Sequence, residues 1–372
     1  MKAQSVDGRN YGIDLLRIVA MMMIPILHVL GHGGILDNSQ IYPGKNKIVW
    51  LMEIIAYASV NIYGLISGYV GYGRKIKYSN IIYLYFQVLF YTVPTTLLTY
   101  IYEPNSIDFE IIKKAIFPFA YNTYWYFSAY FCLFFFMPFL NMVLDKFNRK
   151  EMTKLIVCIL LMFSVAQTVF YSEYCGTNGG YSFLWLGSLY LIGGYIKKYE
   201  EYLPKINYLF GYVICILITW SSKIIIGVIT YRAYHEKRMD DYLIKYTSPT
   251  IVFGAIFLLL FFANYKCGKQ LKKFISFFAP VSFGVYLIHE EPLIRERFIS
   301  GRFVKYLSLN NVFMIMAIVG TVMIIWLIGS LVDKIRLVLF DVFKVKEKCI
   351  WVEKKIMSVI NINNDENCRI GR

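Results

Sequence analysis

Residues 11–30 read YGIDLLRIVAMMMIPILHVL, a nearly continuous apolar stretch that contains two charged side chains and a histidine. A helix needs about 20 such residues to cross the hydrocarbon core of a bilayer. Asp14 and Arg17 stand three residues apart, so they share a helix face and are expected to pair. His28 follows Arg17 by eleven residues, which places both on one stripe, about 16 Å apart along the axis. The stretch therefore predicts a membrane-spanning helix with an unusually polar face.

The composition of the whole chain agrees with this prediction. Of the 372 residues, 58% are hydrophobic and 17% are charged, whereas soluble domains average about 45–50% and about 25%. The mean hydropathy is +0.51, and so much apolar surface has to face lipid. We therefore expect a multi-pass membrane protein whose constant partner is the lipid bilayer, and we exclude a disordered chain and a disulfide scaffold.

Charge and cysteine usage exclude two further classes. The formal net charge of +15 would favour a nucleic-acid partner in a soluble protein. Here the lysines and arginines stand in loops between apolar runs, as the positive-inside rule requires, so no nucleic-acid partner is expected. The seven cysteines are widely spaced, and their spacing is not typical of a metal site, so no metal is expected.

Ten apolar runs fit the template of a membrane span. They cover residues 12–30, 48–70, 79–102, 123–144, 154–171, 182–196, 206–230, 248–265, 272–290 and 311–332. The sixth run is short and contains Gly187, Gly193 and Gly194, which favours a tilted or tightly packed helix. The fold class is therefore predicted to be an all-α bundle of about ten transmembrane helices.

The distribution of positive charge predicts the orientation. With the N-terminus inside, the segments between spans on the inner side carry more lysine and arginine than the outer loops, which the positive-inside rule favours. Ten spans return the C-terminus to the same side. We expect residues 1–11 to be a cytoplasmic N-terminus, residues 12–332 to form the membrane domain, and residues 333–372 to form a basic cytoplasmic tail, in an N-in/C-in arrangement in the plasma membrane.

A second polar cluster closes the ninth run, where Ser282, Tyr286, His289 and Glu290 follow one another. Ionisable side chains inside spans are costly, so each of them is a functional candidate. A carboxylate at this place could orient an imidazole, as it does in acid–base sites. The alternative is an ordinary helix end at the level of the lipid headgroups.

A third candidate is the basic loop after the second run, which contains Arg74, Lys75 and Lys77 beside Gly71 and Gly73. Guanidinium and ammonium groups with flanking glycines suit a polyphosphate. The simpler interpretation is a loop that sets the topology.

These landmarks, taken in order, resemble the membrane acyltransferase-3 family. Asp14-Leu-Leu-Arg17 followed by His28 is similar to the family's first-helix signature, an Arg and a His separated by ten residues. Four further matches are Ser67-Gly68-Tyr69, the loop from Arg74 to Lys77, Trp125-Tyr126-Phe127 with Pro138-Phe-Leu-Asn141, and Ser282-Phe-Gly-Val-Tyr286-Leu-Ile-His289. In the loop, Lys77 replaces the family's second arginine and can bind only as a point charge. The resemblance covers about residues 10–332.

The resemblance implies a bundle that transfers an acyl group, most often acetyl, from cytoplasmic acyl-CoA to a hydroxyl of an extracytoplasmic polysaccharide or lipid-linked glycan. Acyl-CoA is then a co-substrate, no cofactor is bound permanently, and the machinery of glycan synthesis is a candidate partner. The implied catalytic residues are His28, Asp14 and Arg17. The implied contacts to CoA are Arg17, Arg74, Lys75 and Lys77. The implied substrate or supporting residues are Ser67, Trp125, Tyr126, Ser282, Tyr286, His289 and Glu290.

Two questions stay open at the level of sequence. His28 could remove the proton of the acceptor hydroxyl or could itself carry the acyl group. Asp14 lies about 21 Å from His28 along the helix, so an acidic partner for His28 has to come from elsewhere.

The alternative function is a transporter or flippase for glycans or lipid-linked sugars, which also has many spans and buried charges.

Overall fold

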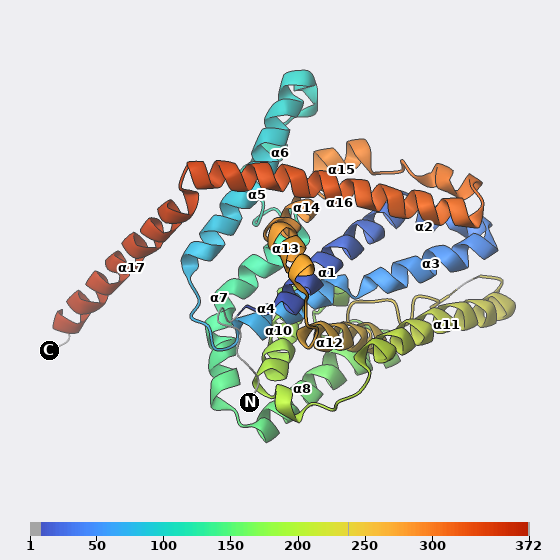
Figure 1. Ribbon diagram of the computed structural model, residues 1–372, viewed down its shortest axis with the longest axis horizontal. Helices are drawn as coiled ribbons and strands as arrows, with labels where there is room; N and C mark the ends of the chain where they lie inside the picture. Colours follow the sequence, from blue (N-terminus) through green and yellow to red (C-terminus); the bar gives the residue numbers. More distant parts are fainter. Residues whose placement is uncertain (1–8, 237, 371–372) are drawn as a thin grey trace.

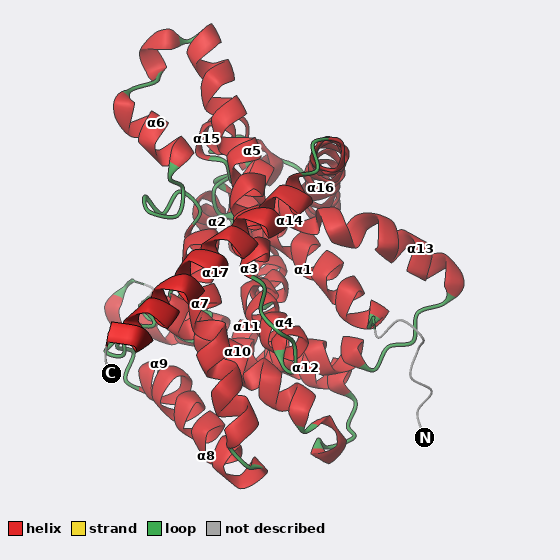
Figure 2. Ribbon diagram, turned by 90° about the vertical axis from the view of Figure 1, so that its left-hand side faces the viewer, coloured by secondary structure: helices red, strands yellow, loops and turns green. Residues whose placement is uncertain are grey.

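The computed structural model describes residues 9–236 and 238–370, and these residues form helices and loops without a β-strand. The bundle is shown in Figure 1, and the all-helical composition is clear in Figure 2. Of the predicted N-terminal segment 1–11, residues 1–8 lie outside the described part of the chain.

The helices follow the predicted apolar runs closely. In chain order they are α1 (Tyr11–Leu30), α2 (Ile35–Asn38), α3 (Pro43–Tyr57), α4 (Ser59–Gly71), α5 (Tyr78–Tyr102), α6 (Phe109–Ile116), α7 (Trp125–Lys146), α8 (Arg149–Leu160), α9 (Gln167–Val169), α10 (Phe183–Lys198), α11 (Tyr208–Tyr234), α12 (Pro249–Ala263), α13 (Lys269–Phe278), α14 (Ser282–His289), α15 (Pro292–Phe298), α16 (Asn311–Val342) and α17 (Val345–Ile370). A π-helical turn (Leu161–Ala166) joins α8 to α9. Each of the ten predicted runs coincides with one or more of these helices.

Among the described residues, eight helical segments are long and apolar enough to cross a membrane. Two of the predicted spans are interrupted, because α3 and α4 meet at Ala58 and a 3₁₀ turn (Ala279–Val281) separates α13 from α14. The helices α10 and α12 have only 16 and 15 residues, short of a full bilayer crossing. The chain is therefore a multi-pass membrane protein with eight clear spans, and the total of about ten stays a prediction.

Helix α1 lies at the centre of the bundle and packs against α3, α4, α12, α14 and α16. Of its most apolar stretch, 67% is buried inside the protein, against 22–33% for α5, α7, α11 and α16. Asn10 begins the helix, since its side-chain oxygen accepts hydrogen bonds from the amides of Gly12 and Ile13. The outer helices face lipid and leave α1 as the scaffold on which the polar side chains stand.

Helices α4 and α10 pack closely against each other, and glycines allow it. A Cβ added at Gly193 would lie 2.0 Å from the carbonyl oxygen of Leu65, and one added at Gly68 would lie 1.9 Å from that of Tyr190. Small residues of this kind bring helix backbones together inside membranes. The tight packing predicted for the glycine-rich sixth run is therefore confirmed at Gly193.

The tenth span is longer than predicted. Helix α16 continues to Val342, so the boundary expected at residue 332 falls inside it. The reason is a buried ion pair: Arg336 Nη2 lies 2.6 Å from Asp333 Oδ2, and the hydroxyl of Tyr91 donates to Asp333 at 2.6 Å. Charges that normally mark a helix end are tolerated here because each has a partner.

The C-terminal helix α17 packs against the start of α5. Glu353 accepts a hydrogen bond from the amide of Tyr78 at 2.7 Å and so supplies the cap that α5 lacks locally. Burial raises the pKa of Glu353, but hydrogen bonds from the Ser79 side chain and from the amides of Tyr78 and Ser79 outweigh it and leave this pKa lowered. The contact fixes the end of α5 that follows the basic loop.

The glycine contact generates a stability test. We expect Gly193→Ala to lower the melting temperature of the purified protein, because a methyl group cannot fit against Leu65 without backbone movement, at a cost of about 1–3 kcal/mol. Gly187→Ala in the same helix is the matched control, since its added Cβ would approach no atom closer than 3.7 Å. Equal melting temperatures for the two variants would contradict the packing described here.

Candidate functional site

Three cavities follow α1 from its first turn to its last. The cavity at the Arg9 end has a volume of about 520 Å³, and the middle cavity and the one around His28 have about 410 Å³ each. Arg17 lines both the first and the middle cavity. Tyr63 and Tyr126 line both the middle cavity and the His28 cavity. The three therefore adjoin one another along the central helix.

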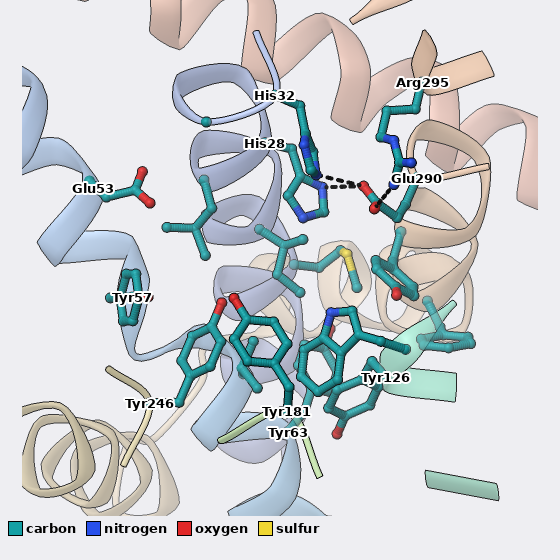
Figure 3. A pocket seen from close by; sticks show the side chains of 18 residues that line it. His28, His32, Glu53, Tyr57, Tyr63, Tyr126, Tyr181, Tyr246, Glu290 and Arg295 are labelled. Carbon is teal, nitrogen blue, oxygen red and sulfur yellow. Dashed lines mark hydrogen bonds and ion pairs between the residues drawn. The ribbon is translucent and has the colours of Figure 1, made fainter. Parts of the chain in front are cut away.

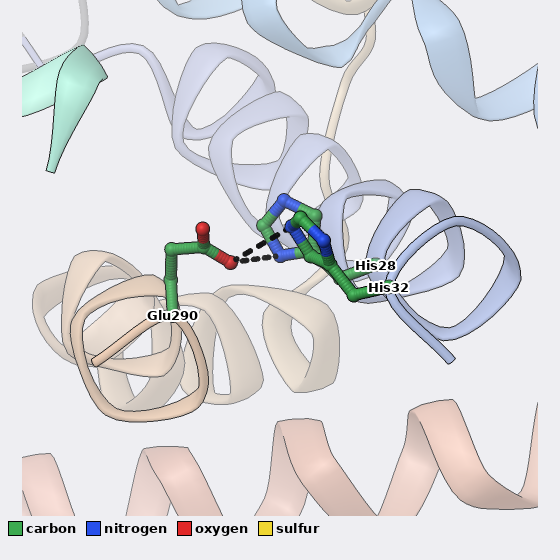
Figure 4. Close-up of side chains that lie close together, drawn as sticks. All are labelled: His28, His32 and Glu290. Atoms are coloured by element: carbon green, nitrogen blue, oxygen red, sulfur yellow. Dashed lines mark ion pairs between the residues drawn. The ribbon is translucent and has the colours of Figure 1, made fainter. Parts of the chain in front are cut away.

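The His28 cavity contains an imidazole beside a carboxylate. His28 Nδ1 lies 3.1 Å from Glu290 Oε2 and 2.8 Å from His289 Nε2. The other carboxylate oxygen of Glu290 accepts from Arg295 Nη1 at 2.5 Å. Glu290, which follows α14 directly, is thus the acidic partner that the sequence could not assign to His28 (Figure 4).

The partners of His289 define which nitrogen of His28 is free. His289 Nδ1 lies against the carbonyl oxygen of Val285, and a carbonyl can only accept, so Nδ1 carries the proton. A neutral His289 then accepts at Nε2, and His28 donates from Nδ1. The lone pair of His28 is left on Nε2, by assignment from hydrogen-bond partners. Figure 3 shows the His28 ring projecting into the cavity.

Glu290 stays ionised in this setting. His28, His32 and Arg295 surround the carboxylate, and the guanidinium of Arg295 favours its ionised form. Glu290 can therefore stabilise positive charge that develops on His28 during a proton transfer.

The rest of the His28 cavity is mainly aromatic. Trp125 and Tyr181 have ring centroids 4.5 Å apart, and Tyr181 and Tyr246 have theirs 5.1 Å apart. Glu53 on α3 is only 6% exposed, and its Oε2 has no hydrogen-bond partner within the described structure. Figure 3 shows its carboxylate on the side of the cavity across from Glu290. A buried polar atom without a partner costs about 1–3 kcal/mol, which points to a ligand group at this place.

The opposite end of α1 is basic. Asp14 joins Arg9 Nε at 2.6 Å and Arg17 Nη1 at 2.5 Å, so the predicted Asp14–Arg17 pair is confirmed. The four predicted CoA contacts all line the middle cavity: Arg17, Arg74, Lys75 and Lys77. The structure thus brings together residues from α1 and from the loop before α5.

The remaining predicted residues divide between the cavities. Ser67 and Ser282 line the middle cavity, where their hydroxyls donate to the carbonyls of Tyr63 and Phe278. The residues Trp125, Tyr126 and Tyr286 line the His28 cavity. Asp14 lines the cavity at the Arg9 end, so the structure does not bring this predicted catalytic residue to His28.

Three ionisable residues that line the His28 cavity were not among the predicted site residues, namely Glu53, His32 and Arg295. Arg295 follows the ninth predicted run, and nothing in one sequence distinguishes a charge that turns inward from one that faces water. The spacing of His28 and His32, four residues apart, was an available signal, since such residues share a helix face.

The fold and the cavities define a multi-pass membrane protein that encloses a cavity lined by His28, Glu290 and Arg295. The family model described as an acyltransferase domain, that of the acyltransferase-3 family, matches residues 10–330. The chain therefore belongs to this family and is a membrane acyltransferase, which confirms the resemblance inferred from the sequence. No curated protein and no solved structure matches the chain. Family membership favours the acyltransferase over the transporter alternative.

Proposed function

We propose that the protein transfers an acyl group, in the first place acetyl, from cytoplasmic acyl-CoA to a hydroxyl of an extracytoplasmic polysaccharide or lipid-linked glycan. The observation that carries this proposal is the row of adjoining cavities with basic residues at one end and the His28–Glu290 pair at the other. In the N-in/C-in arrangement, in the plasma membrane, the Arg9 end of α1 faces the cytoplasm.

The basic cavities suit the donor. The phosphates of CoA are anionic, and Arg74 can contact them with two parallel hydrogen bonds, whereas Lys75 and Lys77 act as point charges. Arg17 stands about 16 Å from His28 along α1, so the phosphates and the reacting carbon occupy different cavities. The thioester arm then passes between them beside Tyr63 and Tyr126, which line both.

The His28 pair suits the transfer step. His28 Nε2 accepts the proton of the acceptor hydroxyl as its oxygen bonds to the acyl carbon, and Glu290 stabilises the imidazolium that results. The carbon–sulfur bond breaks, and the CoA thiolate leaves as the thiol after taking that proton. The other route places the acyl group transiently on the same nitrogen.

The aromatic part of the His28 cavity suits the acceptor. Faces of Trp and Tyr contact the apolar side of a sugar ring, while their polar groups and a carboxylate reach its hydroxyls. Glu53 offers the unpartnered oxygen for one such hydroxyl. The acceptor then lies between Glu53 and His28 with a second hydroxyl at Nε2.

The catalytic pair is tested by substitution in proteoliposomes supplied with acetyl-CoA and a glycan fraction from the native cell surface. We expect His28→Ala to reduce transfer by about 10²–10⁴-fold, the usual contribution of a general base. Glu290→Gln is expected to reduce the transfer rate less, because His28 keeps its basic nitrogen and loses only the negative charge beside it.

His235→Ala is the matched control for this experiment, since His235 is exposed beyond the end of α11 and lines none of the three cavities. Full transfer activity in His28→Ala would show that the chemistry occurs elsewhere.

The donor site is tested by the Michaelis constant for acetyl-CoA. We expect Arg74→Ala to raise this KM about tenfold or more with little change in kcat, because the contact holds a part of CoA remote from the reaction. The KM of Arg74→Lys should fall between those of the wild type and Arg74→Ala, since lysine keeps the charge and loses the paired hydrogen bonds. The control Arg238→Ala removes an exposed arginine outside the cavities. An unchanged KM in Arg74→Ala would remove this loop from the donor site.

A further inference from the structure

Three side-chain atoms of types that ligate metal ions converge in the His28 cavity. His28 Nδ1, His32 Nε2 and Glu290 Oε2 all lie within 4.8 Å of one another. Oε2 is 3.1 Å from the first nitrogen and 3.6 Å from the second. Figure 4 shows both rings turned toward the same carboxylate oxygen.

The local structure favours this convergence. His28 and His32 are four residues apart, which is the spacing at which two helical histidines share one metal ion. Their ring centroids are 5.0 Å apart. Arg295 occupies the other oxygen of Glu290, while Oε2 is buried and forms no hydrogen bond of normal geometry within the described residues. Glu290 Oε2, the oxygen that would face a metal ion, is thus the one without a hydrogen bond among the described residues.

We propose that His28, His32 and Glu290 bind a Zn²⁺ ion reversibly and that the bound ion stops acyl transfer. Two imidazole nitrogens and one carboxylate oxygen, with a fourth position open to water, are a donor set typical of zinc. The harder ions Mg²⁺ and Ca²⁺ prefer oxygen ligands and fit it poorly. The binding site stands on geometry alone, and its effect on activity rests on the function proposed for His28.

The inhibitory effect follows from the two nitrogens of one ring. A metal on Nδ1 of a neutral imidazole requires the ring proton to sit on Nε2. The proton therefore moves from Nδ1 to Nε2, and the lone pair that accepts the hydroxyl proton is lost. The same ion withdraws the Glu290 carboxylate from its role beside His28.

The charges around the site make the binding reversible. A carboxylate binds a metal ion as its anion. Arg295, however, places a positive charge 2.5 Å from the same carboxylate and opposes a second cation there. His32, whose side chain is 42% exposed, gives the ion a route in and out.

Direct binding tests the site without reference to catalysis. The full chain, purified through a tag that contains no histidine, is dialysed against increasing ZnCl₂ and its metal content is measured. We expect the wild type to bind one Zn²⁺ ion. His32→Gln should bind it about tenfold or more weakly, in line with losses seen when metal-site contacts are removed. His235→Gln should match the wild type, and MgCl₂ should not compete.

Inhibition is then measured in each variant as the ratio of transfer rates with and without ZnCl₂. The wild type and His235→Gln should be inhibited and recover with a chelator, and His32→Gln should need about tenfold more zinc. Equal zinc affinity in His32→Gln and the wild type would overturn the site. If the wild type binds zinc through His32 but transfers no acyl group, the proposed function is contradicted. The metal site is then still supported.

Discussion

Charged side chains are stable inside an apolar bundle only when each has a partner, and this constraint organises the protein around α1. At one end of α1, Asp14 binds Arg17. At the other end, Glu290 lies between His28 and Arg295. Because α1 is also the most buried of the eight spans, these pairs fix the elements around it, and the end of α14 is held where its carboxylate meets the imidazole.

The separation of the two charged ends gives the proposed mechanism its direction. A basic cavity can hold an anionic donor near one end of α1 while the imidazole faces an aromatic cavity near the other end. Tyr63 and Tyr126 line both compartments, so the acyl group has to travel only the length of part of one helix. In a soluble enzyme, both substrates would bind in a single cleft.

Much of the fold could be predicted from sequence, because lipid imposes long apolar runs and α1 shows its polar face by spacing alone. The Asp14–Arg17 pair followed from helix periodicity. The partnership of His28 with Glu290 did not, since it depends on how two distant helices pack, and the inward turn of Arg295 is invisible in a single chain. The end of α16 was misplaced because Asp333 has a buried partner within its own helix.

The proposed placement of donor and imidazole is tested by an experimental structure of the protein with an acyl-CoA analogue whose thioester is replaced by an unreactive linkage. We predict that the phosphates lie against Arg74 and Arg17 and that the acyl carbon lies beside Nε2 of His28. Phosphates bound outside the basic cavities, or an acyl carbon remote from His28, would contradict it.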